Sequence, residues 1–107
     1  MIETFPTDLR LDARLKRARM RAWRRGMREM DLILGGFIDR NGESLDADAL
    51  SVFEGLLARR DQDLYRWVCR GGDDAPDDAS PPEADLMRRI VTELPFSEPS
   101  LRAGAAD

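Results

Sequence analysis

The sequence lacks histidine and has a single cysteine among its 107 residues. Without histidine the chain has neither the usual general base near neutral pH nor the commonest zinc ligand. Ser-His-Asp and Cys-His catalysis and most zinc sites are therefore excluded. The lone thiol, Cys69, has no partner for an internal disulfide. Its neighbours Trp67 and Val68 favour a buried or half-buried structural thiol over a reactive one.

Long apolar runs are also missing. No segment approaches the ~20 apolar residues that a membrane-spanning helix needs, and the first twelve residues do not follow the basic-then-apolar order of a secretory signal. Residues 10–25 are basic and helical in pattern, as in a transit peptide, but they contain no serine. We therefore expect a cytoplasmic protein that does not insert directly into a membrane.

The inventory of catalytic groups is thin. The sequence contains neither a phosphate-binding P-loop nor a dinucleotide GxGxxG fingerprint. The carboxylate pairs Asp46/Asp48 and Asp61/Asp63 stand at predicted helix starts, where capping and the helix dipole already account for them. We predict that the chain is not an enzyme: it has no catalytic residue, no metal site and no stably bound cofactor.

Charge is distributed unevenly along the chain. Residues 8–30 contain nine bases and three acids, so their net charge is +6, and the other residues carry −10 because the whole chain carries −4. This asymmetry has two interpretations that charge alone does not separate. It forms a docking surface, or the basic helix pairs with acidic neighbours inside the molecule.

Helical periodicity dominates, and no segment alternates as a strand. We predict an all-α, single-domain bundle over residues 1–107, with an ordered helical core at about 7–94 and a flexible tail at 96–107. Five helices are expected: from Thr7 or Asp8 to Arg25, from Met27 to Phe37 or Ile38, after Asp46, from Asp61 to Gly71–Gly72, and from Ser80 to Leu94.

Helix ends and loops have recognisable signals. Asp46 is a predicted N-cap with Leu45 and Leu50 as a hydrophobic staple, Asp61 is a predicted cap of the fourth helix, and residues 80–83 form a capping box. The Gly35–Gly36 pair is expected to weaken the second helix, and residues 39–43 are predicted to turn through Asn-Gly chemistry. The acidic stretch 71–82 is predicted to be a solvated loop and not a metal-binding tract.

The most informative segment is Arg24-Arg25-Gly26-Met27-Arg28-Glu29. A glycine between two amphipathic patterns is most simply a helix C-cap in the left-handed region. That interpretation leaves the surrounding charge unexplained. If the glycine breaks the helix, the side chains of Arg25 and Glu29 are expected to point outward from a corner, with Glu29 in the first turn of the second helix.

These residues resemble a known family. Arg25-Gly26-Met27-Arg28-Glu29 fits the RGxxE signature of the SdhE-type FAD assembly factors of succinate dehydrogenase. The similarity continues in Ser44-Leu45-Asp46, in the stretch from Asp61 to Val68, and in the last helix around Leu86–Ile90, so that it covers about residues 20–94. The acidic loop 73–80 and the basic N-terminal helix look longer than in the family.

The resemblance implies a five-helix chaperone that binds the flavoprotein subunit of succinate dehydrogenase, or of the related fumarate reductase, and promotes covalent attachment of FAD to a histidine of that partner. FAD would then act through the partner and not through a site on this chain. The implied partner-binding residues are Arg25, Gly26 and Glu29, with Arg24 and Arg28 at the rim and Met27 packing adaptably. Trp67 is expected in the core.

Two other functions remain open at this point. The basic first helix suits a module that binds nucleic acid or another acidic partner, although the acidic net charge opposes nucleic-acid binding. The chain is alternatively a flavin carrier, which a core of this size does not favour. We expect a monomer or a weak dimer without nucleic acid.

Overall fold

The first helix, α1 (Thr7–Trp23), is amphipathic because small apolar side chains recur along one side of it. In the computed structural model, which describes residues 7–94, Leu15, Ala18 and Ala22 of this helix are buried and Leu11 packs at the edge of the core. The helix ends two residues before the predicted end at Arg25. Its narrow apolar stripe is what lets the neighbouring helix approach closely.

The second helical segment is longer than predicted. It comprises α2 (Arg28–Met30), a single π-helical turn η2 (Asp31–Gly35) and α3 (Gly36–Asn41), and the 3₁₀ turn η3 (Gly42–Ser44) follows directly. The predicted Asn-Gly turn over residues 39–43 is wrong. Gly42 has an ordinary helical φ of −54°, and a methyl group on it would lie 2.7 Å from Leu15 Cδ1. This glycine therefore allows α1 to approach and does not reverse the chain.

The Gly35–Gly36 pair also does not interrupt the helix. Both residues have φ of −63°. A side chain at Gly35 would overlap the indole ring of Trp23, which lies across this point of the backbone, and the indole Nε1 donates to Asp39 Oδ2 at 3.1 Å. Glycine lowers the stability of a helix, and the packing of Trp23 from the adjacent helix offsets this loss.

Three further helices complete the fold: α4 (Ala47–Leu57), α5 (Asp61–Cys69) and α6 (Pro81–Thr92). Asp46 caps α4 by accepting from Ala49 N at 2.8 Å, and Ser80 and Glu83 form the reciprocal capping box of α6, so both predictions are confirmed. The predicted cap at Asp61 is wrong. The N-cap of α5 is Arg60, which makes no side-chain cap bond, and Asp61 is already the first helical residue.

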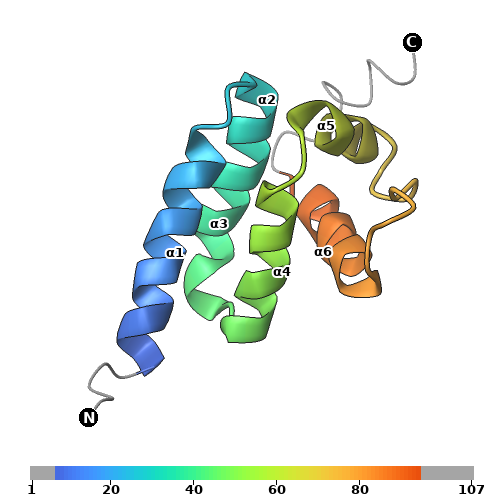
Figure 1. The fold of residues 1–107 in the computed structure, drawn as a ribbon. Coiled ribbons are helices and arrows are strands. Elements are labelled where there is room, and N and C mark those ends of the chain that lie inside the picture. Colours follow the sequence, from blue (N-terminus) through green and yellow to red (C-terminus); the bar gives the residue numbers. More distant parts are fainter. Residues whose placement is uncertain (1–6, 95–107) are drawn as a thin grey trace.

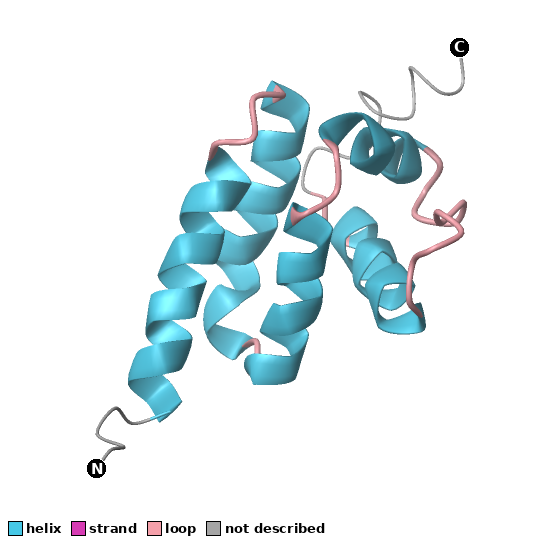
Figure 2. Ribbon diagram, viewed as in Figure 1, coloured by secondary structure: helices cyan, strands magenta, loops and turns pink. Residues whose placement is uncertain are grey.

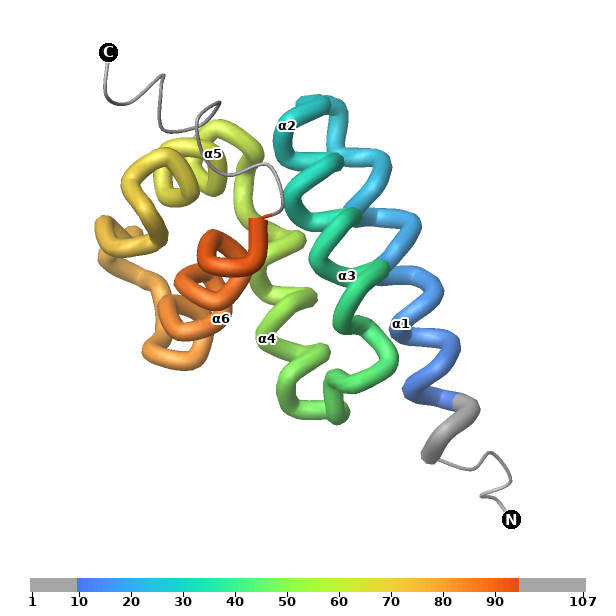
Figure 3. The backbone as a smooth tube through the Cα atoms, turned by 180° about the vertical axis from the view of Figure 1, so that it is seen from behind, coloured from blue at the N-terminus to red at the C-terminus, as the bar shows by residue number. Residues whose placement is uncertain are grey.

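The predicted all-α fold with five helical segments is confirmed, and the described residues contain only helices and loops (Figure 2). α1, α2–α3 and α4 run side by side in alternating directions, while α5 and α6 lie on the other side of α4 (Figures 1 and 3). One apolar core joins all five segments, and Trp67, Phe37 and Phe53 are among its largest fully buried side chains. The prediction that Trp67 belongs to the core is confirmed.

The stretch between α5 and α6 is exposed, as predicted, but its acids are not simply solvated. Within the described residues three of them meet arginines, in the pairs Asp73–Arg88, Asp74–Arg70 and Asp78–Arg59. The stretch is also attached to the core, since buried Gly72 accepts a 3.1 Å hydrogen bond from Trp67 Nε1. The predicted tail 96–107 lies outside the described residues.

Candidate docking site at the α1–α2 corner

The corner between α1 and α2 turns at Gly26, whose φ is +102°. This positive φ confirms the predicted left-handed glycine. Glycine is needed here because residues with a Cβ are strained in this region. An added Cβ would meet no other atom of the described chain within 4 Å. The glycine is therefore required by the backbone and not by crowding, and its outer side is open to a second molecule.

The expectation that Arg25 points outward is wrong. Its side chain is only 9% exposed and lies against the connection between α4 and α5, where Nη1 donates to Leu57 O at 2.8 Å. The same guanidinium donates to Arg59 O and forms an ion pair with Asp61. The last carbonyl of α4, a carbonyl of the α4–α5 connection and a carboxylate at the start of α5 thus accept from its planar donor fork. Arg25 ties the corner to the rest of the bundle.

A second carboxylate holds the backbone of the corner. Asp31 Oδ1 accepts from the Arg25 backbone N–H at 2.8 Å, and the Asp31 N–H bonds to Met27 O at 2.9 Å. Sequence reasoning assigned no role to Asp31 and treated Asp61 as a cap. The role of Asp61 does not follow from local spacing, because Arg25 and Asp61 are 36 positions apart. The role of Asp31 has one local signal, an aspartate six residues after the arginine that precedes the left-handed glycine.

The other residues of the predicted site divide into two groups. Arg24, Arg28 and Glu29 are exposed, and Glu29 stands in the first turn of α2 as predicted. Met27 is half-buried and packs against this chain's own core. The corner thus presents two cations and one anion around a bare glycine.

The helix α2, which contains Glu29, packs against α5. The pKa of Tyr65 is raised above its ordinary value, chiefly by a hydrogen bond with Cys69, then by burial and the charge of that cysteine, and finally by the negative charge of Glu29. Cys69 is half-buried, as expected for a structural thiol. The corner therefore borders the α5 surface around Tyr65.

Both interpretations of the charge asymmetry apply, each to a different part of α1. Some bases pair inside the molecule: Arg14 with Glu54 at 2.9 Å and Arg19 with Asp39 at 2.9 Å. The hydrogen bond that Arg14 donates to Glu54 raises the pKa of Arg14, against the effect of burial. Within the described residues no ion pair involves Arg17, Arg21, Arg24 or Arg28. The side of α1 that faces the bundle is neutralised and the outer side is not.

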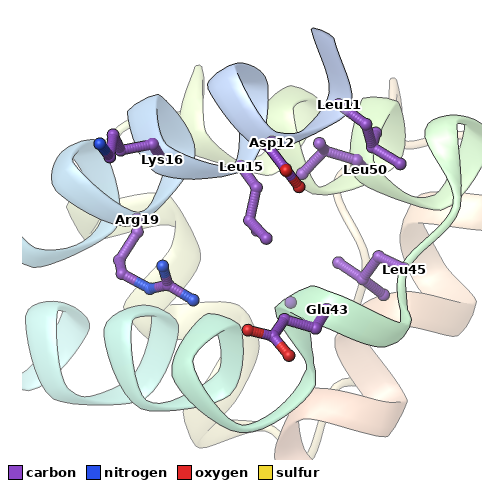
Figure 4. Close-up of a pocket in the computed structure, with 9 residues that line it drawn as sticks. Leu11, Asp12, Leu15, Lys16, Arg19, Glu43, Leu45 and Leu50 are labelled. Atoms are coloured by element: carbon purple, nitrogen blue, oxygen red, sulfur yellow. The ribbon is translucent and has the colours of Figure 1, made fainter. Parts of the chain in front are cut away.

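Two grooves lie along α1. The first, of about 380 Å³, is next to the corner and is lined by Met20, Arg21, Arg24 and Arg25. The second, of about 440 Å³, lies between α1, η3 and the start of α4; Figure 4 shows leucines and charged side chains of both signs, with Arg19 and Glu43 on opposite sides. Within residues 7–94 no three acidic or cysteine side chains gather as a metal site, and no helix is long and apolar enough to cross a membrane.

A small helical bundle with a rigidly held, charged corner has the features of a protein-docking module. A family model described as "Flavinator of succinate dehydrogenase" matches residues 16–93, which run from the middle of α1 past the end of α6. The chain belongs to this family.

Individual relatives agree with the family match. The chain is 33% identical over 81 residues to the FAD assembly factor SdhE of Acetobacter pasteurianus, covering 76% of this chain and 71% of the relative. It is 36% identical over 67 residues to the SdhE protein of Pseudomonas aeruginosa, covering 63% and 71%. It is 29% identical to the mitochondrial succinate dehydrogenase assembly factor 2 of Candida glabrata over 77 residues, covering 70% and 50%. No solved structure is matched significantly.

Proposed function

We propose that this chain is an assembly factor that binds the flavoprotein subunit of succinate dehydrogenase and promotes covalent attachment of FAD to it. The observation that carries the proposal is the family match over residues 16–93, which includes the whole corner from Trp23 to Arg28. The relatives are called assembly factors, in keeping with a chaperone and not a catalyst. FAD stays with the partner, whose own groups form the bond, while this chain favours the partner conformation that reacts.

The corner is the proposed contact site. Gly26 allows a close approach of the partner backbone because, within residues 7–94, only its two neighbours in sequence lie near the position of an added Cβ. Arg24, Arg28 and Glu29 supply exposed charges of both signs for charge-assisted hydrogen bonds, each worth about 1.5–3 kcal/mol when desolvated. Met27 contributes a flexible apolar edge. Arg25 acts mainly as a positioning residue, because its guanidinium is occupied by α4 and α5.

Several finer points belong to the same proposal. The flavoprotein subunit of fumarate reductase is a second candidate partner, because it is related to that of succinate dehydrogenase. The chain acts in the cytoplasm as a monomer or weak dimer and does not bind nucleic acid. The acidic net charge of −4 supports the last point.

The decisive experiment is co-expression with the flavoprotein subunit, followed by in-gel fluorescence of covalently bound flavin. We expect the wild-type chain to co-purify with the subunit and to increase its covalent flavin. Gly26→Arg is expected to abolish both effects, because a long side chain would project from the corner into the partner.

The matched control is Gly71→Arg. Gly71 also has positive φ, +72°, and only the Asp73 carboxylate comes near its added Cβ, at 3.9 Å. Gly71→Arg therefore carries a backbone cost of about 1–2 kcal/mol, and Gly26→Arg a larger one because its φ lies farther from the left-handed helical region. Circular dichroism should show both variants folded. Normal flavin attachment with folded Gly26→Arg would contradict the proposal, as would equal loss with Gly71→Arg.

A further inference from the structure

The outer side of α1 contains cations that the molecule does not use itself. Arg17 and Arg21 lie one turn apart on the same side of α1, Arg24 follows directly after the end of the helix, and Met20 lies beside Arg21 and Arg24. We call these four residues the basic face. Arg14 next to this face is bound by Glu54 and Ser51. Within the described residues the three arginines of the basic face make no ion pair.

The basic face also has an apolar centre. Met20 is 50% exposed, the most of any large apolar side chain in the described part of the chain. It lines the groove of about 380 Å³ together with Arg21, Arg24 and Arg25. Arg24 belongs both to this groove and to the corner, so the two surfaces are continuous. Charged and apolar groups that adjoin in this way are characteristic of protein interfaces.

We propose that the basic face is a second docking surface, which continues from the corner and binds a carboxylate-rich patch of the partner protein. The identity of that partner, the flavoprotein subunit, is taken from the proposed function, and the inference rests on it in this respect. Guanidinium groups match carboxylates in a bidentate geometry, and the exposed thioether of Met20 packs against apolar side chains between them. Positive charge along the whole outer side of α1 would also speed the encounter with an acidic surface.

The other anionic partners fit less well. A nucleic acid would meet Glu29 at the corner and an acidic chain overall, whereas a protein surface can pair with both signs of charge. An anionic membrane would need an apolar helix side free to enter it. The apolar side of α1 (Leu15, Ala18, Ala22) is already buried in the core.

The test measures the dissociation constant for the purified flavoprotein subunit at low and high salt. Arg17→Glu/Arg21→Glu leaves every corner residue intact. We expect it to weaken binding at least tenfold at low salt and to flatten the salt dependence. The control Arg66→Glu/Arg70→Glu makes the same change in charge with the same spacing at the end of α5, where Arg66 belongs to the helix and Arg70 is its C-cap and pairs with Asp74. It should change the affinity less than twofold, and circular dichroism should show both variants folded.

The outcomes separate this inference from the proposed function. If the wild-type chain does not bind the subunit at all, the proposed function fails. If the wild-type chain binds but both double variants weaken binding equally, or neither does, the basic face is not a docking surface. Equally tight binding of duplex DNA or phosphatidylglycerol vesicles, lost in Arg17→Glu/Arg21→Glu, would assign the basic face to that ligand instead.

Discussion

The α1–α2 corner and the α5–α6 loop are both charged connections on the surface, but they use their charges in opposite ways. In the loop, Asp73, Asp74 and Asp78 each meet an arginine of this chain. At the corner Arg25 and Asp31 are turned inward and bind groups of this chain, whereas Arg24, Arg28 and Glu29 are exposed. Three acids of the loop are therefore neutralised within the molecule, whereas most charges of the corner are exposed.

One residue connects the two regions. The backbone carbonyl of Arg59 accepts from Arg25, while its side chain binds Asp78 of the loop and Glu83 of α6. The Arg59 guanidinium also lies 5.8 Å from the ring centroid of the core residue Trp67. The corner is therefore held by the part of the bundle that holds the loop, which explains how a short turn with a bare glycine keeps a defined shape.

The two regions should differ most in how far the free energy of unfolding falls when an arginine is replaced by alanine. Arg25→Ala should lower the free energy of unfolding by about 3–5 kcal/mol, because it leaves Asp61 and two carbonyls unpaired in a largely buried site. Arg70→Ala removes an exposed pair with Asp74 and should cost less than about 1 kcal/mol. Urea unfolding followed by circular dichroism measures both values.

Arg25→Lys tests the geometry of the same site. Lysine keeps the charge but lacks the planar fork, so it should recover only part of the lost stability. Equal costs for Arg25→Ala and Arg70→Ala would show that the corner is no more firmly held than the loop.

A smaller loss of stability is expected at the contact between Trp23, at the end of α1, and Gly35 of the second helical segment. Gly35→Ala should destabilise by about 1–3 kcal/mol, because the new methyl group displaces the Trp23 indole. Gly36→Ala is the matched control. Its methyl group meets only the flexible end of Arg40, at 3.2 Å, and helix propensity favours alanine by about 1 kcal/mol.

Thermal unfolding and tryptophan fluorescence report on these two variants. We expect Gly35→Ala to melt at a lower temperature with altered emission from Trp23, and Gly36→Ala to melt at or above the wild-type temperature. The reverse order would mean that the indole does not rest on the Gly35 backbone.

The smallest effect concerns how the stability of the fold depends on pH through Glu83 of α6, which shares Arg59 with Asp78 of the loop. Burial opposes ionisation of Glu83, but hydrogen bonds from Arg59 and from the Ser80 backbone outweigh it and lower the pKa of this carboxyl below its ordinary 4.5. Glu83 therefore stabilises the fold above about pH 4.5, and this stabilisation is lost as the pH falls through the lowered pKa. Glu83→Gln should cost about 1–2 kcal/mol at neutral pH.

That cost should shrink as the solution is acidified, because protonated Glu83 also loses its ion pair with Arg59. Denaturant titrations of the wild-type chain and Glu83→Gln at pH 7 and at pH 3 measure the difference. A constant difference between the two proteins would show that the Arg59–Glu83 pair does not contribute through its charge. Glu93 also has a lowered pKa, chiefly through a hydrogen bond from Asn41, and its effect cancels in this comparison.

Much of the fold could be predicted because its signals are local. The Asp46 cap, the Ser80–Glu83 box and the left-handed Gly26 each depend on residues within three or four positions. The errors arose where a local signal competed with distant packing. Asn41-Gly42 looks like a turn, but Leu15 of α1 requires a glycine there and the helix continues to Asn41.

The residues of the candidate site also divide into those whose position local signals predicted and those whose position distant packing decided. Charge and spacing were enough to identify the corner and to place Glu29 in the exposed first turn of α2. They did not reveal the direction of Arg25, because its partners lie 32 to 36 positions away on other helices.

The amino-acid sequence by itself determined that the helices form, the caps at Asp46 and Ser80 and the apolar residues of the core, since periodicity and capping act within one or two turns. Only the tertiary structure decided which charges are neutralised and which face outward, because an ion pair depends on which helices pack side by side. Arg14 and Arg17 show this plainly. They lie one turn apart on α1, yet the first meets Glu54 of α4 and the second has no ion pair among the described residues.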